Sequence, residues 1–247
     1  MGLKAVAQSQ SQSQSQQTDA SYNTTYGTPS LNPIATGTYN TANGYYALNS
    51  LTTGSDNTAN GSNALASLTT GSYNTANGYY ALNSLTAGSS NTAIGYGALK
   101  LNSMGSQNTA IGVTAGAFIA DGITANDTPS GSVFIGYGSK SGFQGQSNEI
   151  VIGNSAIGAG GNSVTLGNTY ITITVLQGSV GIGTTSPNAY AILDVTSTSK
   201  AFVLPRMTTA QKLAGIVTPV SGMLVYDTTL NKLSVYGASS WQTVTSV

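Results

Sequence analysis

Carboxylates and tyrosines are the side chains that could do chemistry here, because the 247-residue sequence contains neither histidine nor cysteine. That absence excludes an imidazole base, a thiolate nucleophile and a cysteine-ligated zinc site. Asp121 and Asp127 lie six residues apart, and a glycosidase uses two carboxylates that flank the bond it cleaves. Both occur in Asp-Gly and Asn-Asp contexts typical of turns. We interpret them as part of a loop that could contact a receptor, and we expect no catalytic residue, metal or cofactor.

Tyrosines form a second candidate site, because they recur at equivalent positions of a repeated unit. The receptor-binding candidates among them are Tyr45, Tyr46, Tyr79, Tyr80 and Tyr96. One interpretation is an exposed aromatic face that stacks on sugars. The alternative is a structural ladder in which rings pack turn on turn or chain on chain, since aromatic pairs stabilise sheets by themselves.

Two residues are the only members of their type in the chain, and we interpret both as structural. Glu149 is the only glutamate, and we expect either an ion pair with Lys140 on the adjacent turn or a solvated charge. Trp241 is the only tryptophan, and we expect it to anchor the core of a C-terminal cap.

The charge content restricts the classes of partner. Charged residues make up 6% of the chain, with 7 basic and 7 acidic side chains. So few basic residues argue against nucleic-acid binding, whose affinity comes largely from neutralised phosphates. No stretch reaches the 18 or so apolar residues of a membrane helix, and the first residues lack the apolar core of a secretion signal. We therefore expect a soluble protein that is not conventionally secreted.

The elements that position these residues are copies of a 17-residue unit. Copies begin at Gly37, Gly54, Gly71, Gly88 and Gly105, and each carries the pattern N-T-x-x-G. Helical repeats need about 33 residues or more, whereas this length fits one coil of a β-solenoid. We expect the last glycine of the pattern to adopt a positive φ, and the Asn and Thr side chains to stack into ladders.

The unit then drifts but keeps a short strand that ends in glycine. These strands lie at residues 133–136, 150–153, 164–167 and 180–183. Each 17-residue copy offers only two or three large apolar side chains, such as Leu48 and Leu51. Their burial falls short of the conformational entropy lost on ordering a coil. We therefore expect neighbouring coils and other chains to supply further burial.

The sequence divides into three predicted segments. Residues 1–19 are a low-complexity Gln/Ser tract that we interpret as an attachment peptide. Residues 20–183 form the β-roll shaft, and the alternating residues 171–176 are predicted to be a strand. Residues 184–247 form a small β-rich cap. In it, a capping box at 208–211 begins a helix that runs to about residue 216, and 223–227, 232–236 and 241–244 form a β-meander.

Two families resemble parts of this sequence. The N-S-V-x-L-G-N run at 162–168 and the segment 150–158 resemble head repeats of trimeric autotransporter adhesins. The 17-residue unit is similar to repeats of bacteriophage tail fibres. Residues 180–187, 193–195, 204–211 and 222–227 resemble a module near the C-termini of such fibres.

The resemblance implies an all-β homotrimer with a solenoid shaft and a C-terminal cap. It further implies a structural and adhesive fibre whose residues 1–19 attach to a virion tail or baseplate protein. The other end would then meet a glycan or protein on the host cell surface. We favour the virion because no secretion signal or membrane anchor is recognised. The alternatives are a bacterial cell-surface adhesin or filament subunit, a connector fibre that binds no receptor, and a glycan-cleaving tailspike that uses Asp121 and Asp127.

Overall fold

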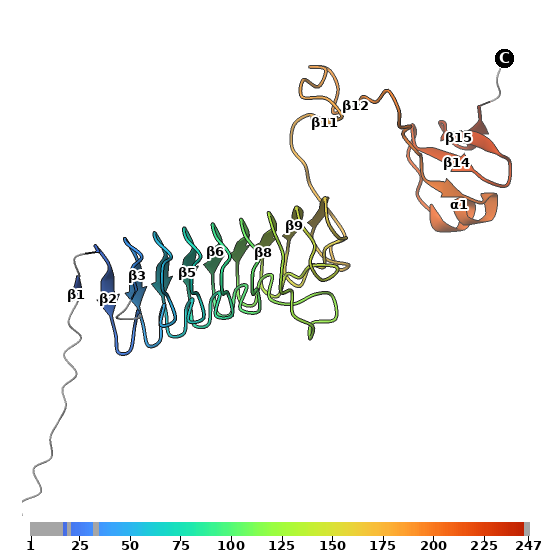
Figure 1. The fold of residues 1–247 in the computed structure, drawn as a ribbon. Helices are drawn as coiled ribbons and strands as arrows, with labels where there is room; N and C mark the ends of the chain where they lie inside the picture. Colours follow the sequence, from blue (N-terminus) through green and yellow to red (C-terminus); the bar gives the residue numbers. More distant parts are fainter. Residues whose placement is uncertain (1–16, 19–20, 32–34, 245–247) are drawn as a thin grey trace, which may run out of the picture. The chain divides into compact units, whose positions relative to one another are not determined.

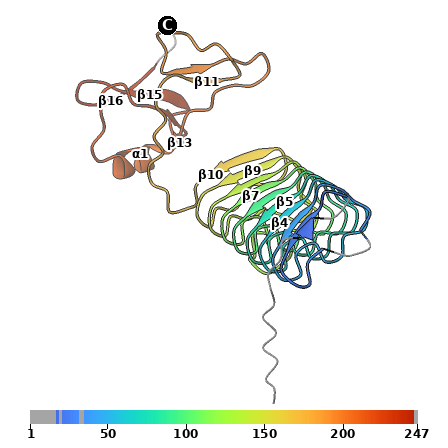
Figure 2. The ribbon, with the colours of Figure 1, turned by 90° about the vertical axis from the view of Figure 1, so that its left-hand side faces the viewer.

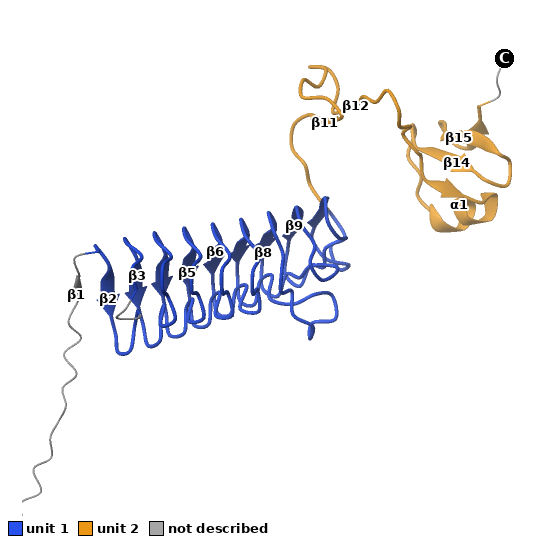
Figure 3. Ribbon diagram, in the orientation of Figure 1, with its two compact units in different colours: residues 1–173 blue, residues 174–247 orange. Residues whose placement is uncertain are grey.

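The computed structural model describes residues 17–18, 21–31 and 35–244. The predicted attachment peptide, residues 1–19, lies outside this part of the chain except for Gln17–Thr18. Two compact units follow one another along the chain, with the boundary after Ile173 (Figure 3). The described residues are all-β apart from the short helix α1, Thr209–Gly215. The predicted fold class, a β-solenoid followed by a small β-rich cap with one helix, is confirmed.

The first unit is a stack of coils that each contribute one short strand to a ten-stranded sheet (Figures 1 and 2). Neighbouring strands from β2 to β10 are parallel, and β1 pairs antiparallel with β2. The strands are β1 Gln17–Thr18, β2 Thr24–Tyr26, β3 Thr41–Asn43, β4 Thr58–Asn60, β5 Thr75–Asn77, β6 Thr92–Ile94, β7 Thr109–Ile111, β8 Val133–Ile135, β9 Glu149–Ile152 and β10 Ser163–Leu166.

The register of the sheet follows the sequence repeat. Thr41, Ala42 and Asn43 lie beside Thr58, Ala59 and Asn60, and the same offset of 17 residues continues to β7. The middle residue of each of these strands is fully buried, because successive side chains of a strand point to opposite faces. The first and third residues therefore form the outer face of the sheet.

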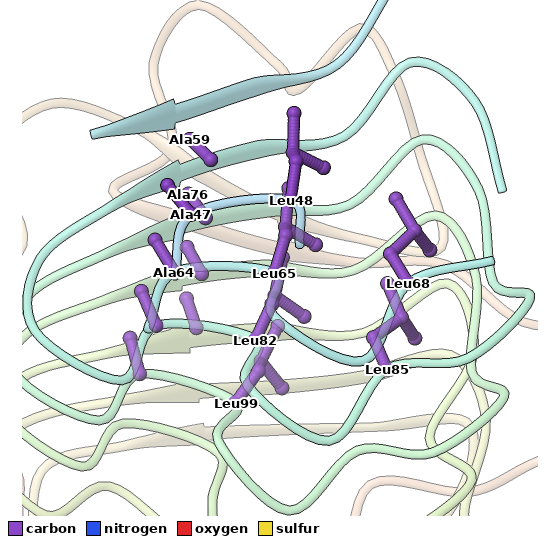
Figure 4. Packing of buried hydrophobic residues seen from close by; sticks show 14 of the residues in the cluster. Ala47, Leu48, Ala59, Ala64, Leu65, Leu68, Ala76, Leu82, Leu85 and Leu99 are labelled. Carbon is purple, nitrogen blue, oxygen red and sulfur yellow. The ribbon is translucent and has the colours of Figure 1, made fainter. Parts of the chain in front are cut away.

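Leucine and alanine ladders fill the core of the first unit (Figure 4). Leu48, Leu65, Leu82 and Leu99 stack in one row and are 0% exposed. Their φ angles of 50 to 52° lie in the left-handed region, which costs a residue with a Cβ about 1–2 kcal/mol. Burial of each leucine contributes about 1.5–3 kcal/mol and offsets this strain. Coils of the same chain supply the burial, so this core gives no reason to expect other chains around it.

Glycines are required where neighbouring coils approach each other. Gly44 has a φ of 144°, as predicted for the last glycine of the repeat pattern. A Cβ on Gly44 would lie 2.5 Å from the Gly61 carbonyl oxygen, and a Cβ on Gly71 would lie 2.1 Å from that of Gly88. A side chain is thus excluded at Gly44 by both backbone conformation and lack of space, and at Gly71 by lack of space.

The end of the shaft differs from the prediction. The sheet ends with β10, and residues 171–176 form no strand and are exposed, so the strand predicted there is wrong. The alternating apolar pattern of these residues does not make a strand, because no neighbouring strand among the described residues pairs with their backbone. β11, Val180–Ile182, pairs in parallel with β12, Leu193–Val195, and not with the shaft. The expected shaft boundary at residue 183 therefore moves toward residue 173.

The second unit contains the predicted helix and meander. Thr208 caps α1, and its side chain and that of Gln211 form the reciprocal hydrogen bonds of a capping box. β14 Leu224–Asp227, β15 Lys232–Tyr236 and β16 Trp241–Thr243 form the antiparallel meander. β13, Arg206–Met207, was not predicted from the sequence, and its two residues pair in parallel with β14.

A buried ion pair joins the helix of this unit to its sheet. Lys212 Nζ lies 2.7 Å from Asp227 Oδ2, with the two side chains 3% and 0% exposed. Lys212 also donates to Ser234 Oγ at 3.1 Å and lies 5.2 Å from the centre of the Trp241 ring. Trp241 is half-buried and packs edge-on against Tyr236, so its interpretation as an anchor holds only in part.

Candidate interaction surfaces

The candidate tyrosines lie in the turn that follows each strand. The Tyr79 and Tyr96 rings stack with centres 5.5 Å apart, and Tyr80 meets Tyr79 edge-on at 4.4 Å. Tyr45 and Tyr46 form the same edge-on pair at 4.2 Å. The structure thus joins three of the five predicted residues in one cluster. The other two stand apart because the intervening coil has Ser62 and Asn63 at these positions.

The cluster combines the two interpretations of the tyrosines. The rings contact one another, as a structural ladder requires, yet Tyr45, Tyr79 and Tyr96 remain 52%, 45% and 51% exposed. Hydrogen bonds between neighbours, to Tyr46 and Tyr80 respectively, raise the pKa of Tyr45 and of Tyr79. A phenol can both donate and accept hydrogen bonds, so these exposed side chains offer both functions to a ligand.

A shallow pocket of about 200 Å³ adjoins the cluster. Its walls combine two aromatic rings with an amide, a hydroxyl and an ammonium group. The lining residues are Tyr80, Asn83, Ser84, Tyr96, Lys100 and Leu101. Sequence reasoning missed Asn83, Ser84 and Lys100, although they share neighbouring positions in consecutive coils. Asn83 and Lys100 occupy the same position of consecutive 17-residue units. This shared position, and not the residue types, could have predicted that they lie beside the tyrosines.

Lys100 connects this pocket to the loop inserted between β7 and β8. Its Nζ lies 5.7 Å from the centre of the Phe118 ring. Phe118 begins a hairpin-like excursion, in which it bridges to Ala125 and the Ile119 amide donates to the Thr124 carbonyl at 3.0 Å. The predicted loop is therefore folded on itself.

The two aspartates of this loop serve its turns. Asp121 Oδ1 accepts hydrogen bonds from the amides of Ile123 and Thr124, each at 2.8 Å, and Oδ2 accepts one from the Thr124 hydroxyl. The Thr124 hydroxyl, followed by the two amides, lowers the pKa of Asp121. Asp127 accepts a bond from the Thr128 hydroxyl at 3.4 Å. These contacts agree with the turn interpretation, and the pKa of Asp121 is lowered, whereas a general acid needs a raised one.

Both expectations for Glu149 are wrong, because it forms no ion pair with Lys140 and its side chain is buried instead of solvated. Within the described ranges, Lys212–Asp227 is the one ion pair closer than 4.0 Å. The buried Glu149 carboxylate instead accepts bonds from the Ser141 hydroxyl at 2.7 Å and from the amides of Gly160 and Gly142 at 3.0 and 3.3 Å. Backbone amides at the end of the coil stack thus satisfy this charge.

No group of three or more acidic side chains that could hold a metal ion occurs in the described part of the chain. Over the same residues, no helix has the length and apolar character needed to cross a membrane.

The second unit exposes large apolar side chains. Ile192, Phe202 and Val203 are 83%, 64% and 65% exposed. Val225 is the one buried hydrophobic residue among the described residues of this unit. Phe202, Val203 and Leu204, with Arg206 and Tyr226, line an open pocket of about 280 Å³. Exposed apolar surface of this kind is typical of an interaction site.

The same part of the chain matches a known protein family. Residues 181–247 match the family model of the phage tail like trimerisation region. This match supports a phage tail-fibre-like protein and a homotrimer. No curated protein and no solved structure matches the chain.

Proposed function

We propose that the chain is a homotrimeric tail fibre of a bacteriophage, with a structural and adhesive role and no enzymatic activity. The observation that carries the proposal is the match of residues 181–247 to a phage tail like trimerisation region, directly after a β-solenoid shaft. In this proposal residues 1–19 bind a virion tail or baseplate protein, and the remainder of the fibre extends toward the host. Three chains multiply weak contacts by avidity.

Labelling of virions tests the location. Gold-labelled antibodies against residues 35–173 should decorate the tails of phage particles in electron micrographs. Antibodies that decorate the surface of the host bacterium and leave the particles bare would favour the alternative, a cell-surface adhesin or filament subunit. A fibre that decorates tails but does not affect adsorption would be a connector.

The finer proposal is that the tyrosine pocket binds a glycan of the host surface. Tyr80 and Tyr96 supply aromatic faces, while Asn83, Ser84 and Lys100 supply hydrogen-bonding groups around about 200 Å³. Carbohydrate recognition needs this combination of an amphipathic ring with fixed polar groups. The pocket stands on a rigid coil stack, so its groups are arranged before the ligand binds.

Substitution of Tyr96 tests this glycan site. Tyr96→Ser copies Ser62, which occupies the equivalent position, so the coil should fold normally. We expect at least tenfold weaker binding to host surface polysaccharide, measured by biolayer interferometry. Tyr73→Ser is the matched control, because Tyr73 is 66% exposed, lies outside the pocket and has Ser90 as its equivalent. Equal loss in both variants, or no loss in either, would refute the site.

A further inference from the structure

The outer face of the solenoid sheet changes its chemistry along the shaft. In β3, β4 and β5 its first and third residues are Thr and Asn. From β6 onward the second outward-facing residue of each strand is apolar, and from β8 onward the first outward-facing residue is apolar as well. We call the following residues the apolar strip: Ile94, Ile111, Val133, Ile135, Ile150, Ile152, Val164 and Leu166.

The apolar strip is continuous because its members are neighbours in the sheet. Ile94 pairs with Ile111, and the row continues through Ile135 and Ile152 to Leu166. Figure 2 shows these strands side by side. At about 4.8 Å between strands, the five strands span about 19 Å. Ile94, Ile111, Ile152 and Leu166 are 41%, 40%, 37% and 57% exposed.

The core of the coil does not require these side chains. Buried residues of the same strands, Ala93, Ala110, Phe134 and Val151, point inward and close the core without them. The proximal coils show that Thr and Asn suffice at the outer positions of the same fold. These aligned apolar side chains bury only part of their surface against one another in the monomer, and an exposed row of this kind indicates a covering partner.

We infer that the partner is the same strip of other copies of this chain, so that the trimer interface extends up the shaft as far as β6. This inference rests on the proposed homotrimer. The strip widens from one apolar position in β6 and β7 to two in β8, β9 and β10. It therefore grows toward the point where the chain continues into residues 181–247, the matched trimerisation region. The strip contains no charged residue, as suits a surface that faces identical copies of itself around an axis.

Thiol accessibility in the full chain tests the inference, because the natural sequence has no cysteine. Ile111→Cys places a single thiol in the strip. Met104→Cys is the matched control, because Met104 is an apolar residue outside the strip that is 63% exposed. The mass of each variant is measured first by light scattering, and modification by a bulky maleimide is then timed.

The expected result is a trimer in which Cys at position 111 reacts at least tenfold more slowly than Cys at position 104. A trimer in which both thiols react at similar rates would overturn the inference and leave the proposed homotrimer intact, with the strip open to another partner. A monomer would overturn both. Circular dichroism of the two variants should match the unmodified chain, because neither residue contributes to the core.

Discussion

At the scale of single residues, a buried amide ladder organises the shaft. Asn74 Nδ2 donates to Asn57 Oδ1 at 3.0 Å and to the Gly88 carbonyl at 2.9 Å, and its own Oδ1 accepts from the amide and side chain of Asn91. The same bonds recur from Asn23 to Asn108. Because each amide both donates and accepts, every coil satisfies the polar groups of the next.

Removal of one amide should therefore destabilise the shaft. Asn74→Ala leaves the buried Gly88 carbonyl and the Asn91 side chain with fewer partners, and each unsatisfied group costs about 1–3 kcal/mol. We expect the free energy of unfolding to fall by about 2–4 kcal/mol in urea titrations followed by circular dichroism. Asn43→Ala is the control, because Asn43 is exposed on the outer face, and it should change stability little. Similar losses in both variants would contradict the role of the ladder.

The sequence predicted this ladder as far as Asn108 but not its end. Ser132 and Glu149 occupy the next two positions, where the Ser132 amide donates to Asn108 Oδ1 at 3.0 Å and the Glu149 amide donates to Ser132 Oγ at 3.1 Å. Residue type suggested an ion pair for Glu149. Its buried position in the ladder, which only the register reveals, determines its partners instead.

Asp227 makes the second unit sensitive to acid. Desolvation raises its pKa, but hydrogen bonds from Lys212, Thr209 and the Leu230 amide outweigh that effect and lower the pKa from 3.8 to about 2. A depressed pKa in the folded state gives stability that is complete well above pH 4 and is lost as the pH falls toward 2. Stability of this unit should thus fall between about pH 5 and 2.

The measurement is a pH series of thermal unfolding, followed by the near-ultraviolet signal of Trp241. Asp227→Asn should unfold at a lower temperature at pH 7 and should show a smaller change across the acid range. An acid dependence that is unchanged in this variant would contradict the assignment to Asp227.

At the scale of elements, the spacing between coils decides which residues the repeat tolerates. The first glycine of each unit allows backbone contact, since a Cβ on Gly71 would also lie 2.8 Å from Leu68 Cδ1. The leucine row that contains Leu68 and the row of first glycines therefore constrain each other. The sequence predicted the coil, its strands and the glycine turn because all three follow from the period. It could not predict that β11 leaves the sheet, because a short strand that ends in glycine suits either partner.

Gly71→Ala should therefore break one coil of the shaft. The clash with the Gly88 carbonyl involves backbone on both sides and has no flexible group to yield, so we expect a loss of several kcal/mol. Limited proteolysis should detect new cleavage near residue 71 and its neighbouring coils. Gly215→Ala is the control, because nothing lies within 4 Å of the added Cβ at the end of α1. Resistance to proteolysis equal to that of the control would contradict the packing described for the coils.

At the scale of the whole molecule, the two units differ in what they need from other chains. The shaft buries the leucines of its core within one chain, whereas the second unit leaves residues such as Ile192 and Phe202 exposed. The small number of apolar residues per coil predicted that the shaft core would need partner chains. In the structure, neighbouring coils of the same chain enclose the core leucines completely.

The candidate site shows the same limit of sequence reasoning. Tyrosine positions were predictable from the repeat, but the pocket beside Tyr96 also depends on Lys100, which occurs in one coil only. The pocket therefore depends on a residue that departs from the repeat, and the repeat pattern alone does not predict it. The apolar strip arises in the same way, because Ile replaces Asn at the third strand position in β6 and β7.

The mass of the full chain in dilute solution tests the central claim most directly. Size-exclusion chromatography with light scattering should give about 75 kDa, three times the 24.9 kDa of one chain, at low micromolar concentration. A stable particle of about 25 kDa would contradict the account, because the exposed apolar residues of the second unit and of the strip would then have no partner.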